Sequence, residues 1–222
     1  MILLTQNAKM KKSSQNGINV FNFGIPAFRS EAGLATCPMA GQCATDCYAR
    51  SGTYRFKNTI NAYEQRLALT QLPDFIPLLI ADINLKTLQS KSKGLKTIIR
   101  IHDSGDFYSR DYTKSWFDII NYFKYNTNVS FYAYTKMISL FETIVKPENF
   151  TLIYSFGGKQ DDLIDVNKHR HSKVFENQAL LLQSGYVDTT NDDMLALGTN
   201  HKIGLVYHGV KSYKNTTWSK VG

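Results

Sequence analysis

The three cysteines of the chain, Cys37, Cys43 and Cys47, fall within eleven residues. Their spacing, C-x5-C-x3-C, joins them through small residues, so three thiolates can converge on one metal centre. An odd number of cysteines in one short stretch argues against a disulfide framework. The alternative is that all three are small buried hydrophobic side chains, as free cysteines often are. We expect a metal-binding loop over residues 24–50, here called the cysteine loop.

The identity of the metal depends on whether a fourth protein ligand exists. A closed zinc site needs four ligands. The histidines that could supply the fourth are His208, with His201 as its alternative, and His102. A [4Fe–4S] cluster could instead use the three thiolates and leave one iron open. The spacing of the cysteines does not decide between zinc and [4Fe–4S].

Two aspartates directly follow a short apolar strand, in the stretch IHDSGDF over residues 101–107. Because chemistry in (βα) folds belongs at the carboxyl ends of strands, Asp103 and Asp106 are the candidate catalytic residues. One would act as nucleophile or base, and the other as acid or hydrogen-bond partner. The alternatives are that Asp106 caps the following helix and that either residue belongs to an Asx turn.

Other residues at the strand ends could bind substrate or phosphate. A glycine permits close approach of a ligand to the backbone, and lysines at neighbouring strand ends suit phosphate as point charges. Tyrosines offer faces on which bases stack, although aromatic packing against helices explains them as well. The stretch 169–171, His-Arg-His, is interpreted as a polar connection. The candidate substrate-binding residues are Arg100, His102, Ser104, Gly105, Phe107, Tyr134, Lys136 and Lys159.

These residues need a scaffold of alternating strands and helices. Apolar runs rich in β-branched and aromatic residues predict strands at 18–23, 97–102, 129–134, 150–156 and 203–208. Helical spacing predicts helices at 60–67, from 75 toward 90, and at 116–123, 137–145, 161–169 and 177–184. Alternation of this kind predicts a parallel sheet with right-handed crossovers. A full eight-fold barrel usually takes roughly 250 residues. We therefore expect one α/β domain over 1–222, an incomplete (βα) barrel with mostly parallel strands, with an open doubly wound sheet as the alternative.

The composition is that of a globular protein. The 222 residues are 43 % hydrophobic and 20 % charged, which excludes a disordered or collagen-like chain. No stretch approaches the roughly 18 apolar residues of a membrane span, and the first ten residues lack the layout of a secretory signal. We expect a soluble, cytoplasmic protein with no membrane partner.

The charge is uneven along the chain. The net charge is +8, basic residues gather at the two ends, and residues 161–200 are acidic. If both ends line one surface, that surface suits a polyanion such as nucleic acid. A basic protein with solvated lysines and no nucleic-acid role is the alternative.

The motifs together resemble those of the uncharacterised phage "gene eighty-eight protein" family. They span most of the chain in the family's order: CP at 37–38 through CYA at 47–49, RxHxSGDF at 100–107 with Tyr112 and Trp116, YTK at 134–136, and VYHG at 206–209. Family members often add a second cysteine group before the last strand. This chain has Asn200-His201 there instead, which argues against a second metal site.

A more distant resemblance links the stretch DSGDF at 103–107 to the DSGGF strand end of guanine transglycosylases. Those enzymes are zinc-containing barrels that exchange guanine for a 7-deazaguanine. This chain departs from them by placing its cysteines near the amino terminus and Asp106 where they have the second glycine. The resemblance implies that Asp106 attacks C1′ of the sugar as guanine leaves, while Asp103 handles the proton. The leading hypothesis is therefore a base-modifying enzyme that acts by base exchange, with DNA and a small nucleobase as partners.

The cysteine loop, ending Cys-Tyr-Ala, and the later Thr-Lys strand end also resemble radical-SAM-like phage proteins. The usual spacing there is C-x3-C-x2-C, from which this chain departs, and no glycine-rich methionine-binding strand is obvious. This second resemblance implies a [4Fe–4S] cluster and S-adenosylmethionine. A third hypothesis is a non-enzymatic DNA-binding protein in which the metal is structural. Its DNA binding would survive loss of both aspartates.

Overall fold

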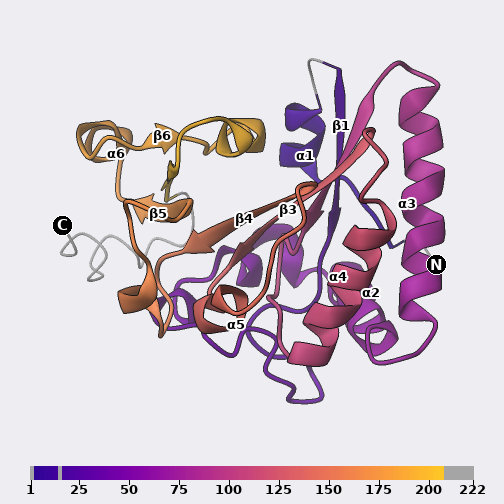
Figure 1. Ribbon diagram of the computed structural model, residues 1–222. Coiled ribbons are helices and arrows are strands. Elements are labelled where there is room, and N and C mark those ends of the chain that lie inside the picture. Colours follow the sequence, from indigo (N-terminus) through magenta and orange to yellow (C-terminus); the bar gives the residue numbers. More distant parts are fainter. Residues whose placement is uncertain (1–2, 15–16, 208–222) are drawn as a thin grey trace.

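Seven parallel strands form one sheet in the computed structural model, which describes residues 3–14 and 17–207 (Figure 1). The strand order is β1-β2-β3-β4-β5-β7-β6, and the register of each neighbouring pair is parallel. The strands are β1 (Ile18–Phe23), β2 (Lys96–Ile101), β3 (Val129–Thr135), β4 (Phe150–Ser155), β5 (His171–Phe175), β6 (Val187–Asp188) and β7 (Lys202–Val206).

The sheet forms half of a barrel. Its neighbours follow chain order from β1 to β5, and no pairing between the end strands β1 and β6 closes it within the described residues. A doubly wound sheet would instead reverse its strand order near the middle. The expected incomplete (βα) barrel is therefore confirmed.

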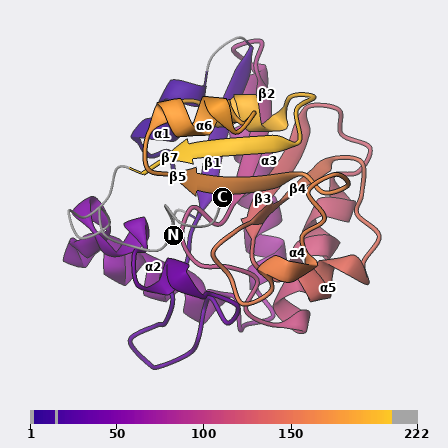
Figure 2. The same cartoon turned by 90° about the vertical axis from the view of Figure 1, so that its left-hand side faces the viewer.

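The longer helices cover the outer face of the half-barrel. Figure 1 shows α3 and α4 side by side on one side of the first strands, with the short α1 on the other. Figure 2 shows α6 next to β7, on which it packs. No helix in residues 3–14 and 17–207 is both long and apolar enough to cross a membrane. The helices are α1 (Ala8–Ser13), α2 (Lys57–Leu69), α3 (Phe75–Lys91), α4 (Arg110–Tyr122), α5 (Ile138–Glu142) and α6 (Gln178–Gln183).

Side chains on the two faces of the sheet form two separate cores. Phe21 and Phe23 of β1 point to the outer core, where Phe23 contacts the ring of Trp116 in α4. Val20 points to the inner core, which also contains Met10 of α1. This alternation follows from the two-residue period of a strand. The inner core leaves the carboxyl end of the half-barrel to polar residues.

The structure differs from the expected elements in several places. Residues 161–169 form only the short 3₁₀ helix η4 (Asp161–Leu163). The Asp161 carboxylate accepts the main-chain N–H groups of Gly157 and Gly158, so the segment begins as a cap on the preceding turn. The predicted polar connection at 169–171 is wrong in its last residue, since His171 starts β5 and is fully buried. The two-residue β6 and the helix α1 were not predicted.

Four further 3₁₀ helices lie in the connections of the chain. They are η1 (Gln42–Ala44), η2 (Tyr48–Arg50), η3 (Gly52–Arg55) and η5 (Asp193–Leu197). The first three succeed one another along the end of the cysteine loop and the approach to α2. The fourth packs against α1.

Candidate functional site

A cavity of about 740 Å³ lies at the carboxyl end of the half-barrel, where residues of β1, β2, β3, β4, β5 and β7 line it. In parallel α/β folds this edge is where ligands bind. The cavity brings together eleven of the predicted site residues: Cys37, Cys43, Cys47, Arg100, His102, Asp103, Ser104, Gly105, Asp106, Tyr134 and Lys136.

The cysteine loop is held against the turn that follows β4. The main-chain N–H groups of Gly41 and Cys43 both donate to the carbonyl oxygen of Gly157, at 3.1 and 3.2 Å. A Cβ atom on Gly41 would lie 3.0 Å from the Gly158 backbone, so the close approach requires glycine at this position. Gly157 and Gly158 therefore hold the loop over the end of the sheet.

The three thiols of the cysteine loop have different proton affinities. Cys47 donates a hydrogen bond to Cys43, and this bond, aided by Lys136, lowers the pKa of Cys43 to about 6 against the effect of burial. The same bond raises the pKa of Cys47. Burial raises the pKa of Cys37 to about 12. The Cys47 hydrogen bond and the nearby ammonium therefore favour the deprotonated form of Cys43, and all three thiols would be deprotonated on binding a metal.

The two candidate metal centres, zinc and a four-iron cluster, place different demands on the three thiols. In residues 3–14 and 17–207, no three His, Cys, Asp or Glu side chains are gathered so that they could hold a metal ion. Zinc, with Zn–S bonds of about 2.3 Å, needs its thiolates within about 4 Å of one another. A four-iron cluster binds each thiolate on a different iron and accepts sulfurs that lie further apart. The thiols still interact, since Cys37 is coupled electrostatically to both Cys43 and Cys47.

Asp106 joins the ends of β2 and β3. Its Oδ1 accepts hydrogen bonds from the Thr135 hydroxyl (2.6 Å) and the Phe107 N–H (2.8 Å), and its Oδ2 accepts the Lys136 N–H (2.9 Å). Burial raises the pKa of Asp106, and these three hydrogen bonds oppose the rise. Both carboxylate oxygens are engaged, so Asp106 fixes the backbone around the cavity.

Asp103 is less completely bonded. Its Oδ2 accepts hydrogen bonds from Tyr63 (3.1 Å), Tyr54 (3.3 Å) and Asn7 (3.4 Å), whereas its Oδ1 is buried without a partner. The Tyr48 hydroxyl donates to the Asp103 carbonyl oxygen. An unpaired buried carboxylate oxygen is costly, and a ligand or water with an N–H or O–H group would relieve that cost.

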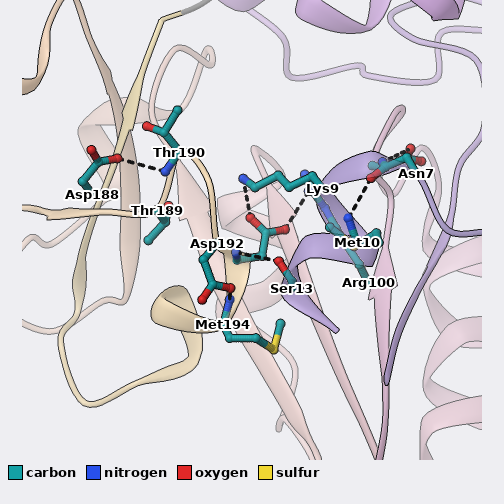
Figure 3. A network of polar contacts seen from close by, with 12 residues as sticks. Asn7, Lys9, Met10, Ser13, Arg100, Asp188, Thr189, Thr190, Asp192 and Met194 are labelled. Carbon is teal, nitrogen blue, oxygen red and sulfur yellow. Dashed lines mark hydrogen bonds and ion pairs between the residues drawn. The ribbon is translucent and has the colours of Figure 1, made fainter. Parts of the chain in front are cut away.

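Arg100 is neutralised within the protein. Figure 3 shows Lys9 of α1 and Arg100 of β2 on either side of a carboxylate, which belongs to Asp193. Its Oδ1 lies 2.6 Å from Lys9 Nζ and its Oδ2 lies 2.7 Å from Arg100 Nη1, while the Tyr132 hydroxyl also donates to Oδ2. Burial would raise the pKa of Asp193, but Arg100 and Lys9 lower it. The guanidinium also lies over the Tyr134 ring, 5.2 Å from its centroid.

Two predicted substrate-binding side chains pack into the outer core, although His102 also borders the cavity. The Phe107 ring is fully buried and packs edge-on against His102, with centroids 4.7 Å apart. The His102 ring also forms a 2.8 Å hydrogen bond between its Nε2 and the Tyr112 hydroxyl. Burial lowers the pKa of His102 to about 3, so the ring is neutral. The predicted roles of both side chains in phosphate binding are corrected to packing, because apolar neighbours enclose them.

Lys159 and Gly105 also have structural roles. The Lys159 ammonium donates to the Pro38 carbonyl oxygen at 3.0 Å and thereby braces the cysteine loop. Gly105 has φ +84°, and a Cβ atom there would lie 2.3 Å from Ile25 Cγ1. The glycine therefore permits close packing of two loops rather than approach of a ligand.

The two histidines proposed as zinc ligands fall in different places. His201 is exposed and immediately precedes β7, and its carbonyl oxygen accepts the N–H of His171 at the start of β5. It therefore lies at the amino end of the strands, opposite to the cysteines. The prediction of His201 as an alternative fourth zinc ligand is wrong. His208 lies outside the described residues.

Several residues that line the cavity were not predicted. Lys9 and Asn7 come from the amino-terminal segment, for which no element was expected. Tyr63 lies within the helix predicted at 60–67 and was not a site candidate, although it and Tyr54 direct their hydroxyls to Asp103. Asp193 lies 93 positions from Arg100, and no local pattern indicates their contact.

A protein-family model described as "Gene product 88" matches residues 1–216 of the chain. No curated protein matches the chain, and no solved structure does.

Proposed function

The chain belongs to the Gene product 88 family, and we propose that it is an enzyme that modifies nucleic-acid bases with a [4Fe–4S] cluster and S-adenosylmethionine. Cys37, Cys43 and Cys47 would hold the cluster. The observation that carries the proposal is that all three thiols line one large cavity at the carboxyl end of an incomplete parallel barrel. A large cavity into which a small number of polar groups converge is where a protein usually binds its ligand and carries out chemistry.

The ligand set supports a cluster with one open iron. Three cysteines supply three thiolates, and among the described residues the only histidine lining the cavity is His102, whose ring is held in the core. Carboxylates such as Asp46 and Asp106 also line the cavity, so the proposal rests on the three cysteines and not on the lack of a fourth ligand. A cluster held by these cysteines would supply one-electron reduction of S-adenosylmethionine, with the electron coming from an external reductant and methionine as one product.

The residues around the cysteines have distinct tasks in this proposal. Lys136 donates to the Ser155 hydroxyl at 2.8 Å and also to the Cys43 sulfur. Its positive charge therefore offsets the negative charge of the thiolates. The unpaired Oδ1 of Asp103 is buried against Gly24, so an N–H group of the substrate would reach it only after a local shift of that backbone. Tyr54 and Tyr63 orient that carboxylate through their hydroxyls.

Base exchange by paired aspartates is the second candidate function. It is favoured by the position of Asp103 and Asp106 on the same cavity wall. Its weakness is that Asp106, the expected nucleophile, already accepts three hydrogen bonds. Asp103, with one unpaired oxygen, is the better nucleophile of the two. A covalent adduct with DNA that Asp103→Asn abolishes would favour this function.

Turnover of S-adenosylmethionine tests the leading proposal. Anaerobically reconstituted protein, reduced with dithionite, should release methionine from S-adenosylmethionine. Cys43→Ser should abolish the release, because it removes one of three thiolates. Thr45→Ser, a conservative change at an exposed position of the same loop, should leave it unchanged. Iron-loaded protein that releases no methionine would contradict the proposal.

An oxygen-sensitive centre also fits a reducing compartment, so the host cytoplasm is the location we propose.

A further inference from the structure

A second, shallower groove lies beside the cavity and carries three arginines. It has a volume of about 380 Å³, and Arg29, Arg50 and Arg55 line it. Their exposed side chains come from the cysteine loop and from η3. We refer to it as the arginine groove.

The arginine groove and the cavity share a wall. Ala27, Ala49, Tyr54 and Tyr63 line both of them. The same tyrosines that hold Asp103 therefore separate the two spaces. Only the thickness of these tyrosine side chains would separate a molecule lying in the groove from the cavity.

The three guanidinium groups are free to bind an anion. Among the described residues, no carboxylate lies within 4.0 Å of any of them, unlike Arg100. Arg29 and Arg50 are nevertheless held in place, since each donates to a main-chain carbonyl of its own loop and each lies 5.9 Å from the Phe28 ring centroid. Of the two glutamates in the groove, Glu64 already accepts the N–H of Glu31. Oriented and unpaired guanidinium groups are the usual ligands of phosphate.

Two aromatic rings lie exposed next to these arginines in the sequence. Phe56 follows Arg55 and is 63 % exposed, and Tyr48 precedes Arg50 by two residues and is 46 % exposed. The Tyr48 ring packs edge-on against Tyr54 and its hydroxyl bonds to Asp103, so its exposed part and the Phe56 ring are the surfaces on which a base could stack. Arginines interleaved with exposed rings are the pattern of proteins that bind single strands, where bases stack on the rings and phosphates meet the cations.

We propose that the arginine groove binds single-stranded DNA and presents one of its bases to the neighbouring cavity. Unpaired bases are favoured over a duplex because only they expose faces for Phe56 and Tyr48. A base drawn out of a strand could also reach a cavity in which it is modified. This inference rests on the proposed function, which explains why the protein would bind DNA. The binding itself needs no metal centre.

Fluorescence anisotropy with a labelled 15-nucleotide DNA strand tests the inference on the full chain. The triple variant R29Q/R50Q/R55Q should bind about 100-fold more weakly at low salt. The slope of log K against log salt should fall by about 2, since each phosphate contact on a single strand contributes roughly 0.7. The control K91Q/K93Q/K96Q removes the same charge from exposed positions near the opposite end of the sheet and should change affinity little.

Phe56→Ala separates stacking from charge. It should weaken binding about tenfold and leave the salt slope unchanged, since it removes a ring and no cation. Equal losses in the arginine and lysine variants would overturn the inference, because they would show general charge attraction. Binding of a duplex as tight as that of the strand would overturn it as well. Cys43→Ser should bind the strand normally, so a failure of cluster loading leaves this test intact.

Discussion

Two walls of the same cavity differ in how far their polar groups are already paired. On the wall formed by Arg100, Asp106 and Asp193, each charge has a partner inside the protein. On the wall formed by the cysteine loop, a hydrogen bond joins Cys47 to Cys43, and a neighbouring lysine favours the deprotonated form of Cys43. Both walls are rich in residues that could do chemistry.

The difference separates residues that hold the site from residues that await a ligand. A buried charge that is paired and hydrogen-bonded holds the backbone around the cavity in place, and removing its partner lowers the stability of the fold. Thiols next to an open cavity gain little from the folded protein and much from a metal. We therefore expect substitutions on the paired wall to lower stability and substitutions in the cysteine loop to lower cofactor binding.

Asp193→Ala should give the largest loss of stability. It leaves Lys9 and Arg100 as two buried cations without their carboxylate. Breaking a buried ion pair costs roughly 3–5 kcal/mol, so the free energy of unfolding in urea should fall by about that amount. Asp162→Ala, at an exposed position, is the control and should change it by less than about 0.5 kcal/mol. An equal, small effect of both changes would show that the network does not hold the wall.

Gly105→Ala should be the next most damaging change. The added Cβ would lie 2.3 Å from Ile25 and would force a strained left-handed backbone. Overpacking costs typically 1–3 kcal/mol, and the backbone strain adds to it. Gly94→Ala is the matched control, because Gly94 has φ +70° but no atom within 4 Å of the added Cβ. The difference in urea midpoint between the two variants measures the packing alone, and identical midpoints would contradict the role assigned to Gly105.

Asp106→Asn should destabilise the protein by about 1–3 kcal/mol. The new amide group must face at least one of the three N–H and O–H donors that the carboxylate now accepts. Asp103→Asn should cost less, since one oxygen of Asp103 has no donor to lose. Thermal unfolding of the two variants compares them directly. A larger loss of stability for Asp103→Asn than for Asp106→Asn would contradict the conclusion that Asp106, and not Asp103, holds the backbone around the cavity.

The buried His102 should make stability depend on pH. Its pKa in the folded protein, about 3, lies below the ordinary value of 6.5, so between these values only the unfolded chain binds the proton. Stability is therefore complete above about pH 6.5 and falls as the pH drops toward 3, by up to about 1.4 kcal/mol per pH unit.

The matched variant for this effect is His102→Asn, because asparagine tolerates the left-handed backbone at φ +63°. The slope of unfolding free energy against pH between 4 and 6 should be shallower in this variant than in the wild type. An unchanged slope would mean that His102 is not buried as a neutral ring.

The sequence predicted the elements that bear strong apolar patterns. β1 to β4 are apolar runs, so their positions and the half-barrel followed from hydrophobicity alone. β5 begins with His171-Ser172 and contains Lys173, so its pattern resembles that of a polar connection. The convergence of the cysteines with Asp103 and Asp106 on one cavity was predictable because each group lies at or beyond a strand end.

The pairing of charges was beyond a reading of the sequence. Whether Arg100 is free or neutralised depends on Asp193, which a different segment brings across the inner face. In the same way, Lys159 was expected at the cavity because it follows a strand, but the cysteine loop captures its ammonium. Contacts between distant segments decide which predicted residues remain available to a ligand.

The iron content of anaerobically reconstituted protein tests the central claim most directly. We expect about four iron atoms per chain with visible absorption in the wild type and in Thr45→Ser. Both signals should be lost in Cys37→Ser, Cys43→Ser and Cys47→Ser, with each variant still folded as judged by urea unfolding. A colourless wild type with one zinc per chain, or iron that survives the cysteine substitutions, would contradict the account.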